Sequence, residues 1–205
     1  MESNLDILDD SRFLFVSGRL CLDFVNTEIM QEGLRADLTP DWDAMSDWLT
    51  AAGLLTSELP ANFRQLEREE ALETALDLRM ALRTLAESLS EAAAVPQAAL
   101  ETINRVLAQN RGVRQVVQEK ATGTYTERFV NEGRGFISLL SPIAQDASDL
   151  LCNGEPTLVR QCENPQCILF FYDTTKYHKR RWCRMSACGN RAKAAAHYQR
   201  QKLQK

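Results

Sequence analysis

The spacing of apolar residues along the chain predicts a fold made mostly of helices. Apolar positions between Leu20 and Ile29 favour a helix over residues 20–31 that ends at Glu32-Gly33. The longest helical pattern runs from about Asn62 to Ala94, with apolar residues largely three and four positions apart. Further helices are expected from Thr39-Pro40 (N-cap and first helical residue) to Gly53, from Pro96 through Leu107, and from Phe136 to Leu151.

One segment has the pattern of strands instead. Val113–Gln118 and Tyr125–Val130 flank a turn at residues 121–123, where Gly123 suits a positive backbone φ. The predicted fold class is therefore mainly α. A multihelical body with one β-hairpin should span residues 1–156, and a small C-terminal module should span residues 157–205.

Charge divides the chain at this boundary. Residues 157–205, the basic module, hold eleven basic and two acidic side chains, a net charge of +9, whereas the body carries −13. Such asymmetry favours contact between the basic module and a polyanion. A solvated tail that balances an acidic body would give the same totals, so charge alone leaves both readings open.

Four cysteines in the basic module have the spacing of a metal site. Cys162 and Cys167 form one pair, and Cys183 and Cys188 form a second pair after a gap of fifteen residues. Two short loops that each present two thiolates suit the tetrahedral geometry of zinc. An apolar strand-like segment at 168–172 and an Ala-rich helix beginning near Ser186 complete a treble-clef-like order of elements.

The ligand set predicts one structural Zn²⁺. A catalytic zinc keeps a position open for water, whereas four thiolates close the coordination sphere. His178 and His197 fall outside the paired spacing, and an iron–sulfur cluster is the less favoured alternative for four cysteines. The remaining cysteines, Cys21 and Cys152, lie in apolar helical contexts and are expected in the core.

Basic side chains surround the cysteines and continue along the terminal helix. A thin, Ala-rich, cationic helix without an apolar stripe suits a nucleic-acid groove or phosphate backbone. The alternative is a zinc-stabilised module that docks an acidic protein partner, such as the body of a second copy. The candidate nucleic-acid contacts are Lys179, Arg180, Arg181, Arg184, Arg191, Lys193 and Arg200.

Motifs at both ends of the chain resemble one known family. The run Cys188-Gly189-Asn190-Arg191, with the cysteine pair at 162–167, is similar to the CGNR-type zinc finger. Segments 22–27 (LDFVNT) and 48–54 (WLTAAGL) resemble the ABATE domain that precedes this finger. The resemblance implies a bacterial, stress-linked transcription regulator whose finger binds DNA, with the same four cysteines as zinc ligands.

The body offers a candidate effector site. Asp23, Asn26 and Thr27 share a helix face, and Arg79 and Arg83 are one helical turn apart, so the five could bind a small ligand. A structural hydrogen-bonded network is the favoured alternative, because buried polar groups are usually satisfied internally. A homodimer is also a candidate assembly, since many DNA-binding proteins read paired half-sites.

Other function classes have little support. The sequence holds no Gly-rich phosphate loop, nucleophile elbow or HExxH pair, so we expect no enzyme. No apolar run approaches the roughly 20 residues of a membrane helix. The acidic first residues differ from a basic signal-peptide start, which predicts a cytoplasmic protein with reduced thiols.

Overall fold

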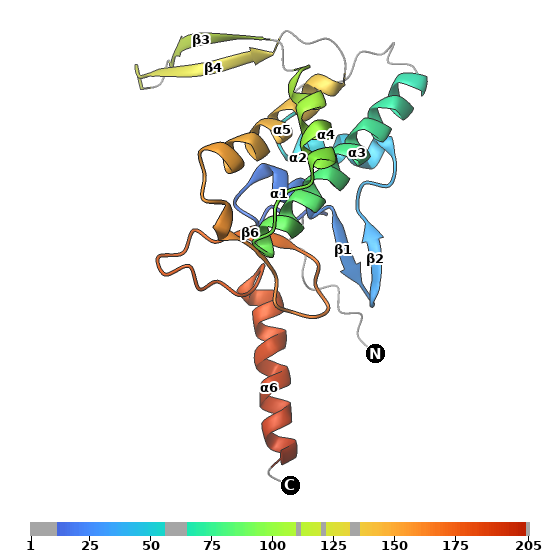
Figure 1. Cartoon of the computed structure of the whole chain (residues 1–205), viewed down its shortest axis with the longest axis vertical. Helices are drawn as coiled ribbons and strands as arrows, with labels where there is room; N and C mark the ends of the chain where they lie inside the picture. Colours follow the sequence, from blue (N-terminus) through green and yellow to red (C-terminus); the bar gives the residue numbers. More distant parts are fainter. Residues whose placement is uncertain (1–11, 56–64, 110–111, 120–121, 132–135, 204–205) are drawn as a thin grey trace.

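A computed structural model of the chain describes residues 12–55, 65–109, 112–119, 122–131 and 136–203. Helices pack into a body, and a smaller region below it carries one helix that projects away (Figure 1). The described α-helices are α1 (Leu20–Val25), α2 (Trp42–Ala51), α3 (Gln65–Ser90), α4 (Gln97–Leu107), α5 (Ile137–Cys152) and α6 (Asn190–Leu203). The described strands pair antiparallel as β1 (Glu28–Gln31) with β2 (Leu34–Asp37), β3 (Gly112–Gln118) with β4 (Tyr125–Asn131), and β5 (Val159–Gln161) with β6 (Phe170–Tyr172). The mainly helical prediction is confirmed.

Helix α3 is the central element of the body. Leu78, Leu82 and Leu85 lie on one face at helical spacing and are fully or almost fully buried. The helix ends four residues earlier than predicted. Ala92 adopts a positive φ of 54°, and the Ala93 amide turns back to the Ser88 carbonyl at 2.8 Å, which closes the helix. The predicted start at Asn62 lies outside the described residues.

The predicted helix over residues 20–31 is correct only as far as Val25. Residues 28–31 form β1 instead, and a two-residue turn leads into β2. Glu32 and Gly33 both have positive φ, at 52° and 83°, which is the backbone of a tight hairpin turn rather than a helix end. The body therefore contains a second β-hairpin that the apolar spacing did not predict.

The start of α2 also differs from the prediction. Asp41, not Thr39, is the N-cap, because its carboxylate accepts a hydrogen bond from the Ala44 amide at 2.9 Å. The Thr39 hydroxyl has other partners, described below. The predicted stop is confirmed, since Gly53 takes a positive φ of 72° directly after the helix.

The remaining predictions for the body agree closely with the structure. Helix α4 follows Pro96, as predicted. Helix α5 runs from Ile137 to Cys152, so each of its ends lies one residue later than predicted. Strands β3 and β4 pair as the predicted hairpin, each one residue longer than predicted, and Gly123 has a φ of +71° in their connection. Residue 121 of the predicted turn lies outside the described part of the chain.

Strand β6 joins the basic module to the body. Phe170 is fully buried in the body's core cluster, whereas its neighbour Phe171 is fully buried against the cysteines. This alternation is that of a strand with an apolar layer on each side. The Tyr172 amide also donates to the Ser17 carbonyl at 2.8 Å. The module and the body therefore share one strand instead of meeting through a linker.

Candidate metal centre and basic surface

The four predicted cysteines converge in the basic module. Their sulfur atoms all lie within 4.8 Å of one another. Cys183 Sγ is 3.7 Å from Cys167 Sγ and 3.6 Å from Cys188 Sγ. Tetrahedral sulfur ligands about 2.3 Å from a zinc ion would stand roughly 3.8 Å apart, so this spacing fits the ion.

Two different loops present the ligand pairs. Between β5 and β6, the Asn164 side chain accepts from the Gln166 amide at 3.1 Å, and the Cys167 amide donates to the Asn164 carbonyl at 2.8 Å. This tight turn holds Cys162 and Cys167 together. In the second pair, Cys183 precedes a π-helical turn, Met185–Gly189, and Cys188 lies within it. This turn leads directly into α6. The hairpin followed by a ligand-bearing helix is the order predicted for the module.

The electrostatics of the cluster favour a divalent cation. A hydrogen bond with Cys167 lowers the pKa of the Cys162 thiol to about 7, and hydrogen bonds from the neighbouring thiols lower the pKa of Cys188 well below its usual value. Hydrogen bonding to Cys162 raises the pKa values of Cys167 and Cys183. Four sulfurs this close can all be thiolates only when a cation shares the site. The Asn164 amide supports them by donating to Cys188 Sγ at 3.3 Å.

Gly189, directly after the last cysteine, lies in a closely packed place. A Cβ atom at this position would lie 2.4 Å from the Met185 sulfur and 3.1 Å from the Trp182 ring. Any larger residue would therefore push Met185 aside and crowd Trp182, which packs against the cysteine cluster. The next residue, Asn190, donates its side-chain amide to the Ser186 carbonyl at 3.0 Å and so bridges the turn.

Arg180, a predicted nucleic-acid contact, is placed inside the module. Its guanidinium donates to the carbonyls of Trp182 at 3.0 Å, Val16 at 2.9 Å and Cys183, and it lies 4.3 Å from the centre of the Phe171 ring. Through these contacts the Arg180 guanidinium connects the loop at Trp182 and Cys183 to the N-terminal segment at Val16. We therefore assign Arg180 a packing role and do not include it in the proposed interface.

Arg181 lies at the surface and has two partners. It forms an exposed ion pair with Glu163 at 2.6 Å, and its guanidinium lies 5.0 Å from the centre of the Trp182 ring. The hydrogen bond with Glu163 raises the pKa of Arg181, so the group stays charged. Exposed pairs of this kind are weak, and a phosphate could compete for the arginine. Lys179 is exposed and Arg184 is half-buried.

The three other predicted contacts, Arg191, Lys193 and Arg200, lie on α6. This helix projects away from the rest of the molecule (Figure 1). Every residue from Asn190 to Lys202 is exposed except the half-buried Ala192. Lys202 adds a further cation, and the helix contains no acidic residue. The structure thus presents a positively charged helix that is open to a partner on nearly all sides.

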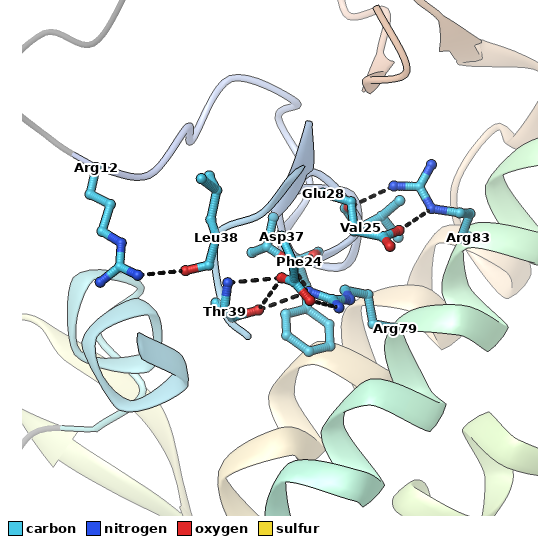
Figure 2. Close-up of polar contacts among 10 residues, drawn as sticks. Arg12, Phe24, Val25, Glu28, Asp37, Leu38, Thr39, Arg79 and Arg83 are labelled. Carbon is cyan, nitrogen blue, oxygen red and sulfur yellow. Dashed lines mark hydrogen bonds and ion pairs between the residues drawn. The ribbon is translucent and has the colours of Figure 1, made fainter. Parts of the chain in front are cut away.

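The candidate effector residues of the body are buried and bonded to protein groups. Arg79 donates to Asp37 at 2.7 and 2.5 Å, to the Thr27 hydroxyl at 2.9 Å and to the Thr39 hydroxyl at 2.8 Å (Figure 2). Burial of Asp37 opposes its ionisation, but the hydrogen bonds from Arg79 and Thr39 outweigh that effect and lower its pKa. This ion pair fixes the base of the β1–β2 hairpin on α3.

Arg83 makes the matching connection one turn further along α3. It donates to Glu28 at 2.7 Å and to the Val25 carbonyl at 3.0 Å (Figure 2). Its guanidinium also lies 5.9 Å from the centre of the Phe170 ring. The acidic partners Glu28 and Asp37 were missed from sequence because both belong to the unpredicted hairpin.

Asp23 and Asn26 hold other segments against α1. The Asp23 carboxylate accepts from the amides of Val16 and Ser17 at 3.0 and 2.9 Å, and burial raises its pKa. Asn26 exchanges two hydrogen bonds with the Phe170 backbone, at 2.8 and 2.9 Å. All five candidate residues therefore take part in the structural network that the sequence analysis favoured, and effector binding there stays a prediction.

The two cysteines outside the metal site differ in burial. Cys21 is fully buried in the core, as predicted, whereas Cys152 is exposed. The prediction for Cys152 is wrong, because this residue is the last of α5 and its side chain is exposed at the end of the helix.

Comparison with protein-family models identifies both parts of the chain. Residues 18–154 match the ABATE model, described as "Putative stress-induced transcription regulator". This match covers more than half of the sequence. The chain belongs to the ABATE family. Residues 159–201 match the CGNR zinc finger. No curated protein matches the chain.

The CGNR match and the sulfur geometry agree on the metal. The four clustered cysteines hold one structural zinc ion, as predicted. The description of the ABATE family is that of a transcription regulator, and this role implies DNA as a partner. Within the described residues, no helix has the length and apolar character needed to cross a bilayer.

Proposed function

We propose that this ABATE protein regulates transcription by binding duplex DNA through α6 and the surface around its zinc site. The exposure of α6 carries the proposal. A 14-residue helix is marginally stable alone, yet α6 extends from the body without covering any apolar surface of it. Cys188 lies two residues before α6, so zinc bound to it orients the start of the helix for a partner.

The positive charges on α6 favour DNA as the partner. Arg191, Lys193, Arg200 and Lys202 lie on different sides of the helix, and the alanines between them keep it thin. An α-helix of this kind fits the major groove with phosphates on both sides. In this proposal Lys179, Arg181 and Arg184 contact the flanking backbone, and the acidic body faces away from the DNA.

A selection experiment tests the proposal. The zinc-loaded chain is incubated with a random duplex pool at physiological salt and excess nonspecific DNA, and bound duplexes are sequenced. We expect an enriched motif that is lost in Arg191→Ala. Arg105→Ala removes an exposed cation from α4 of the body and is the matched control, which should leave the enrichment unchanged.

The alternative partner gives a different result. Docking of an acidic protein would also depend on charge, but it would not select a duplex sequence. Absence of enrichment would contradict DNA binding and leave the acidic protein partner as the explanation for the charge of α6. Enrichment that is equal in the wild type and Arg191→Ala would contradict reading of the sequence by Arg191 on α6.

A further inference from the structure

A hollow of about 710 Å³ opens on the basic module beside the start of α6. Its volume is in the range of sites that hold small molecules. Apolar and aromatic groups contribute much of its lining, namely Val16, Tyr177, Trp182 and Met185, and Lys176 and Lys179 lie among them.

The aromatic lining is unusually accessible. The Tyr177 side chain is 71% exposed, and Met185 is 49% exposed. Lys176 Nζ lies 5.6 Å from the centre of the Tyr177 ring, so a cation accompanies the aromatic face. Exposed aromatic and methionine side chains grouped in a concave site are typical of recognition surfaces.

The charges around the hollow favour an anion. Its lining residues include Lys176, Lys179, Arg181 and Arg184 and no carboxylate. The nearby Asp173 is fully buried, where it accepts hydrogen bonds from Thr175 and from the Arg180 amide. Its charge is therefore used within the loop. Glu163 is paired with Arg181, which leaves Lys176 and Lys179 among the cations that give a ligand a positive environment.

An apolar and aromatic hollow with a cationic border matches a nucleotide. We propose that the hollow takes one unstacked nucleotide of the bound DNA, with its base against Tyr177 and its phosphate between Lys176 and Lys179. This inference rests on the proposed function and extends it. A base inside a regular duplex is stacked on both faces and cannot enter, so the protein should prefer DNA that has an unpaired nucleotide.

The test compares three labelled probes of one sequence bound to the full zinc-loaded chain: a paired duplex, the same duplex with one unpaired nucleotide, and the single strand. Stacking on an aromatic side chain should raise affinity for the unpaired probe over the duplex by roughly 10- to 100-fold. Tyr177→Ala should remove that gain, and Tyr177→Phe should retain it. Tyr125→Ala is the matched control, because Tyr125 is equally exposed, at 71%, on the distant β3–β4 hairpin.

The outcomes separate the two proposals. Equal affinity of the wild type for the paired and unpaired probes would overturn the nucleotide site, and so would equal weakening of all probes by Tyr177→Ala. Duplex binding that is lost in Arg191→Ala would still support the role of α6 in that case. Conversely, preference for the unpaired probe that survives Arg191→Ala, with no duplex binding by the wild type, would support the hollow and contradict the proposed function.

Tryptophan fluorescence gives an independent measurement. Trp182 lines the hollow, whereas Trp42 and Trp48 are buried in the body. Titration with a deoxynucleoside monophosphate should quench the emission, and Trp182→Phe should abolish the change. Equal quenching by inorganic phosphate would overturn the contact with the base.

Discussion

The arginines of the body and those of α6 show opposite relations between charge and packing. Arg79 and Arg83 are only 6% and 7% exposed, and each is matched to an acidic residue of the β1–β2 hairpin. Arg191 and Arg200 are exposed on a helix that has no acidic residue. The first pair has its counter-charges within the fold, whereas the second pair is exposed to solvent and available to a partner.

This difference shows how position decides the role of one residue type. A buried arginine must be paired, because an uncompensated charge in the interior is costly. An exposed arginine is solvated and contributes little to folding. Arg180 is the instructive intermediate, since it lies in the basic module but its guanidinium is bonded to three backbone carbonyls. A charged residue in the sequence is therefore a good candidate for a binding residue only when the fold gives its side chain no partner.

The largest effect should come from removing zinc. Structural zinc sites contribute on the order of 10–16 kcal/mol of binding free energy, so chelation or Cys183→Ser should unfold the basic module. The body should also lose thermal stability, because Phe170 of β6 belongs to its core. Circular dichroism during heating measures both changes. Cys152→Ser, an exposed control, should have no effect, and an unchanged midpoint after chelation would contradict the shared strand.

Breaking the Arg79–Asp37 pair should have the next largest effect. Arg79→Leu leaves Asp37 without its cation and two threonine hydroxyls without their donor. Loss of one partner of a buried pair costs about 3–5 kcal/mol, and the 30% exposure of the Asp37 side chain favours the lower end. Urea unfolding measures the loss. Arg12→Ala, which breaks an exposed pair with Asp47 and an exposed hydrogen bond to the Leu38 carbonyl, should cost no more than about 1 kcal/mol.

Sequence patterns predicted the features that depend on local spacing. The cysteine pairs fix the metal site because each pair lies in one loop, and the period of α3 identifies its buried face. The β1–β2 hairpin was missed because Ile29 and Met30 continue the apolar pattern of α1, and only the turn at Glu32-Gly33 distinguishes strand from helix. The partners Glu28 and Asp37 lie 55 and 42 residues from the arginines that they bind, so no local signal could reveal them.

The junction between the two regions is tested by Asn26→Ala. This change leaves the backbone amide and carbonyl of Phe170 without partners in a buried environment, which should cost about 2 kcal/mol of unfolding free energy. It should also weaken zinc binding, measured by competition with a chelator, because β6 connects to the cysteine cluster. Asn153→Ala removes an exposed hydrogen bond to Asp149 and should change neither quantity. Unaltered zinc affinity in Asn26→Ala would contradict coupling of the zinc site to the body through this pair of hydrogen bonds.

The stabilisation by the Arg79–Asp37 ion pair should decrease when the solution is acidified. The folded-state pKa of Asp37 is lowered, so its stabilisation is present above the unfolded pKa of about 3.9 and disappears as pH falls through the folded value. The stability difference between the wild type and Asp37→Asn should therefore shrink below about pH 4. Taking the difference cancels zinc release, which affects both proteins. A difference that grows toward low pH would contradict an ionised Asp37 in the folded state.

The smallest effect on stability should come from Arg191→Ala, and this change completes the comparison. An exposed helical site tolerates alanine within about 0.5 kcal/mol, because no buried group loses a partner. Its effect should appear in DNA binding instead: a phosphate contact contributes about 0.9 to the slope of log affinity against log salt, and the variant should lose that amount. Arg105→Ala should change neither the slope nor the stability. A large loss of stability in Arg191→Ala would place this residue with Arg79 and Arg180, among the cations that the fold itself uses.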